Sequence, residues 1–242
     1  VTAHFSGPEG GERIRSERGD ILIGADGLHS LVRGHFYPDQ TLHYGGQLMW
    51  RTAVAGTPFL SGRTMIIAGH RNQKVVAYPM APLPDGRAVL NVIAELGEPS
   101  GAPPRADWNR KVDKSRFAAS FANWAFDWLD VPKLIDQAES FFEFPKIDRD
   151  PVPQWTFGRV TLAGDAAHPM QPVGSQAGSQ AIVDGRVLAF HLARNRHDPR
   201  AAIQQYESER LPPMREVALR NRAMGAEIVM DLVEERAPNG FT

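Results

Sequence analysis

The sequence predicts a mixed α/β (α+β) fold in which two separated segments form one domain and an antiparallel sheet lies between them in the chain. Two short apolar runs, residues 21–23 and 159–163, each lead into a turn with glycine and aspartate, and a helical pattern follows. Between these runs, strand-like segments recur at hairpin spacing. The 242 residues are 42% hydrophobic and 23% charged, as in an ordinary globular protein.

The first segment begins with a hairpin pattern over residues 1–23, whose loop is rich in glycine. The second arm ends in the apolar run at residues 21–23, which we expect to be a buried strand end. The glycines of Gly24-Ala25-Asp26-Gly27 permit a tight turn. A short helix is expected to open at Ser30 to Arg33.

Residues 41–145 have the pattern of an antiparallel sheet. Gly and Pro turns separate the expected strands, which are residues 46–54, 63–68, 74–80 and 87–94. Further along, aromatic residues recur at helical spacing at Phe117, Phe121, Trp124 and Trp128. This spacing predicts a helix that Asp107 or Asp113 caps and that packs against the sheet.

After a proline-rich connection at residues 145–158, the chain returns to an α/β pattern. The strand 159–163 ends at Gly164-Asp165, and a loop leads to a helix from about residue 179 to 194. We expect the tail to be helical, with a kink or restart at Pro212-Pro213 because proline lacks an N–H. The tail arginines are interpreted as a solvated helix face with intrahelical pairs: Arg210, Arg215, Arg220 and Arg222.

Composition argues against several classes of function. Lys and Arg total 27 against 28 Asp and Glu, a net charge of -1, so no overall charge favours nucleic acid. No apolar run is long enough for a membrane helix, and residues 1–20 do not resemble a signal peptide. The absence of cysteine excludes disulfides, thiolate nucleophiles and cysteine-bound metals. We therefore expect a cytoplasmic protein that binds neither nucleic acid nor membranes.

Two motifs place a carboxylate at the carboxyl end of a buried strand: Asp26, within residues 23–33, and Asp165, within residues 158–174. In open α/β sheets nucleotides bind at this edge, where glycines let a ligand approach the backbone. Because a carboxylate repels phosphate, a hydroxyl-rich ribose or ribityl chain is the more sensible partner of Asp165. A single Gly-Asp pair also fits a turn or helix cap, but the two motifs together are more specific.

These two motifs resemble those of the single-component FAD-dependent aromatic hydroxylases, and the resemblance continues through residues 181–185. Segments most similar to members of this family that hydroxylate phenazines are residues 46–51, 76–79, 107–110 and 145–155. The resemblance covers nearly the whole chain. It implies an incomplete, Rossmann-like FAD-binding domain built from residues 1–40 and 146–242, with an inserted substrate domain at residues 41–145.

The resemblance also implies roles for individual residues. Those expected to bind the cofactor are Gly164, Asp165, Asp26, Gly27, Arg33, Pro172, Val173, Gly174, Ser175 and Gly178. Asp165 would hold the ribityl chain, whereas Asp26 and Arg33 would lie on the side shared by FAD and NAD(P)H. Pro172 and Gly174, along the flavin ring, are the expected catalytic positions. The amides that open the following helix would stabilise negative charge on the reduced flavin.

Four residues on neighbouring strands are candidate substrate contacts: Trp50, Arg51, Tyr78 and Met80. An aromatic wall with one cation suits a planar aromatic acid. For the apolar members of this set, packing in the core is an equally good interpretation.

The function that the resemblance implies is hydroxylation of a small aromatic or heteroaromatic substrate. NADPH or NADH would reduce FAD, and O2 would add to give a flavin hydroperoxide that transfers its distal oxygen. A flavin oxidoreductase without oxygen insertion would share every motif, and a non-catalytic fragment is a further alternative. His168 has no Ser or Cys partner in its motif, so it is interpreted as structural. No spacing of His or carboxylate residues indicates a metal.

The sequence departs from the family in two places. It has no Gly-x-Gly-x-x-Gly βαβ unit for the ADP half of FAD, so we expect the C-terminal part of such an enzyme, which alone would bind FAD poorly. Ala177 stands where the family loop has a second glycine. If that position needs a positive φ, alanine costs about 1–2 kcal/mol; the alternative is a shifted loop.

Overall fold

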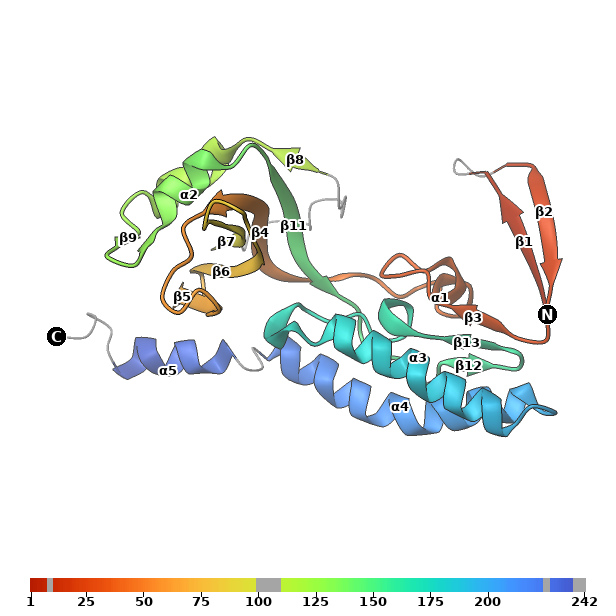
Figure 1. The fold of residues 1–242 in the computed structure, drawn as a ribbon. Coiled ribbons are helices and arrows are strands. Elements are labelled where there is room, and N and C mark those ends of the chain that lie inside the picture. Colours follow the sequence, from red (N-terminus) through yellow and green to blue (C-terminus); the bar gives the residue numbers. More distant parts are fainter. Residues whose placement is uncertain (8–10, 99–109, 224–226, 237–242) are drawn as a thin grey trace. The chain divides into compact units, whose positions relative to one another are not determined.

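A computed structural model describes residues 1–7, 11–98, 110–223 and 227–236 (Figure 1). The mixed α/β fold is confirmed, and the chain forms two compact units. The discontinuous unit comprises residues 1–43 and 147–227, and the sheet unit comprises residues 44–146 and 228–242. The last helix thus groups with the sheet, whereas the sequence assigned it to the third segment.

The discontinuous unit contains a hairpin and a small sheet. In the hairpin, β1 (Thr2–Ser6) pairs antiparallel with β2 (Arg13–Arg18), as the sequence predicts. The apolar run 21–23 does not end this arm: it enters a strand of another sheet, and it is not buried, since Ile23 is 40% exposed. The small sheet has the order β12 (Thr156–Phe157), β13 (Val160–Leu162), β3 (Leu22–Gly24). Strands β13 and β3 are parallel, with Leu162 opposite Gly24. The two strands that carry the motifs therefore end at the same edge.

Three helices complete this unit: α1 (Leu31–Phe36), α3 (Ala177–Arg194) and α4 (Pro199–Arg222). Ser30 caps α1, because its hydroxyl accepts a hydrogen bond from the Arg33 amide at 2.8 Å. Helices α3 and α4 pack along each other (Figure 1). The expected restart at Pro212-Pro213 is wrong, since α4 runs through both prolines. Its buried stripe continues across them, with Tyr206 before and Met214 after, and this packing outweighs the lost backbone hydrogen bonds.

The sheet unit is built on six strands, and the four strands that the sequence predicts are confirmed. Their order is β5 (Ile66–His70), β6 (Gln73–Pro82), β7 (Ala88–Gly97), β4 (His43–Gly56), β11 (Phe141–Asp148), β8 (Lys111–Val112). The pairs β5–β6, β6–β7, β7–β4 and β11–β8 are antiparallel. Smaller elements are the strand pair β9 (Ala125–Phe126) and β10 (Leu129–Asp130), with α2 (Val131–Gln137) and α5 (Ile228–Arg236).

The helix predicted from the aromatic spacing does not form. Two short 3-10 turns, Lys114–Arg116 and Ala118–Phe121, are followed by the β9–β10 pair, and the helix begins only at Val131. Asp113 caps the first turn, whereas Asp107 lies outside the described residues. The turns bring Phe117, Phe121 and Trp124 to the core, as a helix would, so their spacing alone does not distinguish the two structures; Trp128 is 40% exposed and does not join this core.

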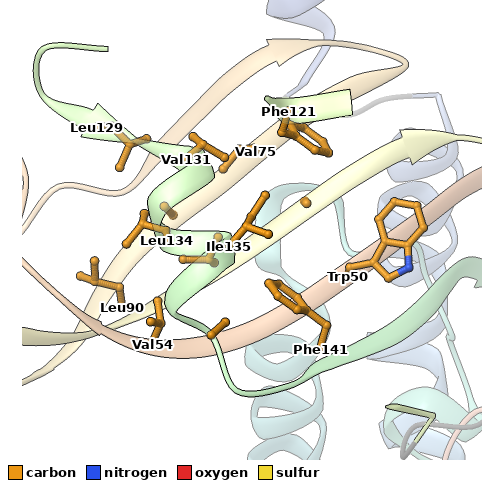
Figure 2. Close-up of a cluster of buried hydrophobic side chains, with 14 of the residues drawn as sticks. Trp50, Val54, Val75, Leu90, Phe121, Leu129, Val131, Leu134, Ile135 and Phe141 are labelled. Atoms are coloured by element: carbon orange, nitrogen blue, oxygen red, sulfur yellow. The ribbon is translucent and has the colours of Figure 1, made fainter. Parts of the chain in front are cut away.

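One face of the sheet is covered by α2 and the aromatic turns, and the core lies between them (Figure 2). From α2 come Val131, Leu134 and Ile135, and from the strands come Trp50, Val54 and Leu90. Because side chains alternate along a strand, Arg51 and Asn91 lie on the opposite face. No helix among the described residues is both long and apolar enough to cross a membrane.

Truncation of Phe121, which is 0% exposed, should destabilise the sheet unit strongly. Phe121→Ala leaves a cavity in the core and should lower the free energy of unfolding by about 3–5 kcal/mol. Phe126→Ala is the matched control, because Phe126 is 43% exposed. Urea unfolding of both variants measures the difference, and equal losses would show that Phe121 does not belong to the core.

Candidate functional site

The shared edge of β3 and β13 is formed by close backbone packing. The Ala163 amide donates to the Gly24 carbonyl at 2.9 Å, so pairing continues to the last residue of β3. A Cβ on Gly24 would lie 2.8 Å from Val32 of α1, which leaves no room for a side chain. The turn at Gly164 has a φ of +58°, which favours glycine. The two motif turns are thus fixed side by side.

The Asp26 carboxylate caps α1. One oxygen accepts from the Ser30 hydroxyl at 2.5 Å, and the other accepts from the amides of Leu31 at 2.7 Å and Val32 at 3.2 Å. Both oxygens therefore satisfy N–H and O–H groups at the start of the helix. At this turn, Gly27 leaves the backbone open, because a Cβ there would meet no atom within 4 Å.

Arg33 is buried and ties the second motif turn to the first segment. Its guanidinium donates to the carbonyls of Ala166 at 2.9 Å and Ala167 at 2.8 Å, and to the Asp150 carbonyl at 2.9 Å. Its Nε donates to Gln40 at 2.7 Å. Burial, with the nearby Arg149 charge, lowers the pKa of Arg33 to about 10. Its guanidinium is thus engaged by protein groups.

Asp165 is exposed, as Asp26 is, but its carboxylate has no hydrogen-bond partner in the described part of the chain. The residue lies in a single 3-10 turn, Gly164–Ala166, directly after β13.

The loop before α3 exposes its backbone. Pro172, Gly174, Ser175 and Gly178 are exposed, whereas Val173 is buried. Positive φ values fall on Gly174 (+72°) and Ser175 (+52°). Ala177 is the first residue of α3 and has no positive φ, so the cost expected for alanine at a positive φ does not arise. No side chain caps α3, which leaves its first amides without that partner.

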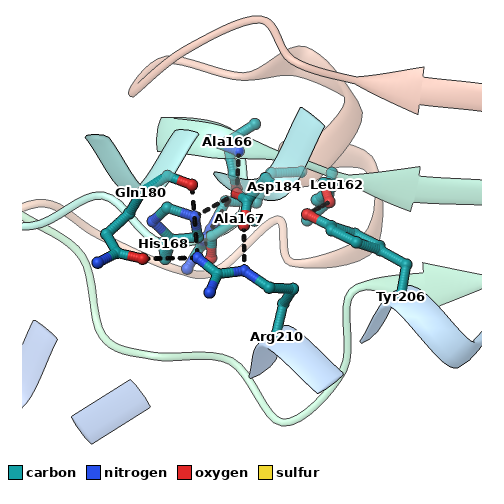
Figure 3. Close-up of polar contacts among 10 residues, drawn as sticks. Leu162, Ala166, Ala167, His168, Gln180, Asp184, Tyr206 and Arg210 are labelled. Atoms are coloured by element: carbon teal, nitrogen blue, oxygen red, sulfur yellow. Dashed lines mark hydrogen bonds and ion pairs between the residues drawn. The ribbon is translucent and has the colours of Figure 1, made fainter. Parts of the chain in front are cut away.

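Behind the Gly164 turn lies a buried polar cluster (Figure 3). One Asp184 oxygen accepts from the Gly164 amide at 2.9 Å and contacts His168 Nε2 at 2.5 Å. The other oxygen accepts from Arg210 Nε at 2.8 Å. Arg210 also donates to the Gln180 side chain at 2.7 Å. The cluster joins α3, α4 and the turn that presents Asp165.

Burial would raise the pKa of Asp184, but hydrogen bonds and charge from His168 and Arg210 outweigh it, so this pKa lies below 3.8. The Tyr206 hydroxyl, which donates to the Leu162 carbonyl at 3.2 Å, has its pKa raised by burial and by the Asp184 charge. The carboxylate is therefore ionised at neutral pH and holds the turn as an anion.

The interpretation of the tail arginines is wrong for two of the four. Arg210 is 7% exposed and pairs with Asp184, while Arg222 forms a two-pronged ion pair with Asp148 at 2.9 and 3.0 Å. Arg215 and Arg220 are exposed. A signal for Arg210 existed in the sequence: it falls at helical spacing between Tyr206 and Met214, on the apolar side of α4.

The sheet unit holds a cavity of about 680 Å³, whose wall includes residues of the sheet face that carries Arg51 and also Gln137 at the end of α2. Arg51 and Met80 line it. Tyr78, whose hydroxyl lies 3.4 Å from an Arg51 nitrogen, is on the same face. Trp50 is not: it is 4% exposed, stacks on Phe117 and belongs to the core, the alternative that the sequence left open. The described residues contain no group of three side chains suited to a metal ion.

The fold and the two motif turns define a class of protein. A family model described as FAD binding domain matches residues 1–221, and the chain belongs to this family.

Among curated relatives, the phenazine 1,6-dicarboxylic acid hydroxylase PhzS of Lysobacter antibioticus is 39% identical over 218 residues, which are 88% of this chain and 53% of the relative. A 3-amino-4-hydroxybenzoate 2-monooxygenase of Streptomyces platensis is 37% identical over 216 residues, 88% of this chain and 52% of the relative. The chain thus spans about half the length of the curated relatives it matches.

Solved structures agree with this assignment. Klebsiella pneumoniae HpxO, complexed with FAD and uric acid, has a TM-score of 0.74 and 25% identity, over 97% of this chain and 58% of that one. The 2,6-dihydroxypyridine-3-hydroxylase of Arthrobacter nicotinovorans has a TM-score of 0.66 at 20% identity, over 100% of this chain and 63% of that one, which shows the fold alone.

The residues at the strand edge fit part of FAD. Asp165 supplies an uncommitted acceptor for ribityl hydroxyls. At Gly27 and Gly178 a Cβ would meet no atom within 4 Å, so a ligand has access to the backbone. The uncapped start of α3 suits the negative charge of a reduced flavin.

Asp184→Asn should destabilise the protein at neutral pH by about 3–5 kcal/mol, because Arg210 and His168 lose a buried charged partner. Since folding lowers the pKa of Asp184 below 3.8, its contribution is complete above that pH and is lost as pH falls through the folded pKa. The difference between wild type and variant should therefore shrink in acid. Denaturant unfolding at pH 7 and pH 3 measures this. Asp165→Asn, an exposed control, should change little; a pH-independent difference for Asp184→Asn would contradict the assignment.

Proposed function

We propose that the protein containing these residues is an FAD-dependent monooxygenase that hydroxylates a small aromatic or heteroaromatic substrate, with NADPH or NADH as electron donor. The observation that carries the proposal is the edge where β3 and β13 end together, with the uncommitted Asp165 carboxylate, in a chain of an FAD-binding family. The hydroxylase and monooxygenase names of the relatives support the reaction type.

In this proposal each side chain at the edge has a separate task. Asp165 accepts hydrogen bonds from the ribityl hydroxyls, and Gly164 gives the turn its left-handed conformation. Asp26 and Arg33 act as positioning residues, because their polar atoms hold α1 and the Gly-Asp turn. The exposed backbone of Pro172 and Gly174 would face the ring, and the first amides of α3 would lie near its anionic edge.

Bound FAD, once reduced, supplies the electrons that activate O2 for oxygen transfer to the ring. The residues of this chain contribute binding, orientation and charge, since the Ser30 hydroxyl, which contacts the Asp26 carboxylate, is 6% exposed and caps α1 rather than facing a ligand as a nucleophile. The cavity on the sheet, with Arg51 in its wall, is the proposed substrate site. The lack of cysteine supports a place in the cytoplasm.

The reaction is tested by oxygen uptake and product mass on the complete protein with NAD(P)H and an aromatic acid. A product heavier by one oxygen atom supports the proposal. Consumption of NAD(P)H with no oxygen in the product identifies an oxidoreductase without oxygen insertion, and absence of flavin absorbance identifies a non-catalytic protein.

Asp165→Ala in the complete protein should release FAD. Ribityl hydroxyls would lose their acceptor, and FAD binding should weaken by about 1–3 kcal/mol. Flavin content by visible absorbance and affinity by titration measure the effect. Asp39→Ala, which removes another exposed carboxylate of the discontinuous unit, is the control and should retain FAD. Unchanged flavin affinity in Asp165→Ala would remove this residue from the site.

A further inference from the structure

The turn that presents Asp165 begins at Gly164 and ends at His168. The Gly164 carbonyl accepts from the amides of Ala167 and His168, both at 2.9 Å, so the backbone of the turn closes on itself. Asp165 is exposed, whereas the three residues that follow it are buried. The place of the Asp165 side chain therefore depends on how the two ends of this turn are held.

One oxygen of Asp184, on α3, contacts both ends of the turn (Figure 3). Asp184 Oδ2 accepts from the Gly164 amide at 2.9 Å and contacts His168 Nε2 at 2.5 Å. The other oxygen, Oδ1, accepts from Arg210 Nε at 2.8 Å, which orients the carboxylate from α4. Asp184 is 0% exposed, so water does not compete for these contacts.

The contact with Asp184 assigns a proton to His168 Nε2. The Asp184 carboxylate is ionised, since its pKa lies below 3.8, and an ionised carboxylate only accepts hydrogen bonds. Nε2 must therefore be the donor. The other ring nitrogen, Nδ1, is buried and has no hydrogen-bond partner among the described residues, so a second proton there would be a donor without an acceptor. A neutral imidazole with its proton on Nε2 fits the cluster.

We propose that His168 is a positioning residue for FAD: by donating from Nε2 to Asp184 it holds the far end of the turn and fixes Asp165 for the ribityl chain. The inference rests on the proposed function, in which Asp165 binds that chain. The partner of His168 lies 16 residues away on α3, the helix whose uncapped first amides are assigned to the flavin ring. The contact thus connects the two groups that are proposed to hold the cofactor.

The test compares His168→Gln with His168→Asn in the complete protein. Both variants carry an amide, but the nitrogen of Gln lies as far along the side chain as Nε2, whereas Asn is one methylene shorter and does not reach Asp184. His168→Asn should bind FAD about tenfold more weakly, because a hydrogen bond to a charged group is lost. His168→Gln should recover most of the affinity. Titration of FAD, followed by visible absorbance, measures both.

His197→Asn is the matched control, because it makes the same change at an exposed histidine of the discontinuous unit. It should bind FAD as wild type does. A His168→Gln variant that binds FAD no better than His168→Asn would overturn the inference.

Amide hydrogen exchange without FAD separates positioning from general stability. The Leu162 amide, which donates to the Trp155 carbonyl at 3.2 Å, reports on opening of the small sheet. In His168→Asn, the Gly164 amide should gain at least about tenfold in exchange rate relative to the Leu162 amide, because its acceptor Asp184 is no longer held. Equal acceleration of both amides would show a merely structural role and refute the proposal. A wild type that binds no FAD would refute the proposed function, while exchange at Gly164 would still decide whether His168 holds the turn.

Discussion

The parallel pairing of β3 with β13 is the constraint on which the candidate site depends. It joins two parts of the chain that are far apart in sequence and sets their register so that Gly24 and Leu162 lie opposite each other. Every other feature of the edge follows from this register. Position 24 has no room for a side chain because Val32 of α1 packs directly against it. Arg33 reaches the carbonyls of Ala166 and Ala167 because the turns that follow β3 and β13 begin at the same edge of the sheet.

Three aspartates near this edge have different uses because their surroundings differ. Asp26 is taken up by the start of α1, and Asp184 is taken up by the Gly164 amide, His168 and Arg210. Both carboxylates satisfy groups that the fold would otherwise leave without partners. Only the carboxylate of Asp165 faces outward with its accepting capacity intact. The fold thus uses two of these carboxylates to hold a helix start and a turn, and leaves the third without a protein partner among the described residues.

The sequence predicts the sheet well, because alternating apolar residues and Gly or Pro turns determine strands locally. It also places the two motif turns together, since parallel strands end at one edge. It does not predict the three backbone carbonyls that accept from Arg33, which lie 117 to 134 residues away and have no sequence pattern. The spacing of the aromatic residues at 117–128 does not predict their structure, because both turns and a helix can bring residues at this spacing to a core. The charge of Arg210 predicts exposure, but its position in the apolar stripe of α4 buries it.

The insertion of the sheet unit has a consequence for chain entropy. Strands β4 and β11 contact each other through side chains along their length, with residue numbers falling along β4 as they rise along β11. Trp50 contacts Glu143, Gln47 contacts Lys146, and His43 contacts Asp148 at 3.1 Å. The two points where the chain leaves and re-enters the discontinuous unit are therefore held together by the sheet itself. For an unfolded insertion, closing this loop costs entropy that grows with the logarithm of its length. Once the sheet has folded, the entropy cost of pairing β3 with β13 is that of a much shorter loop. The stability of the sheet unit therefore favours the β3–β13 edge, although no residue of the sheet unit belongs to that edge.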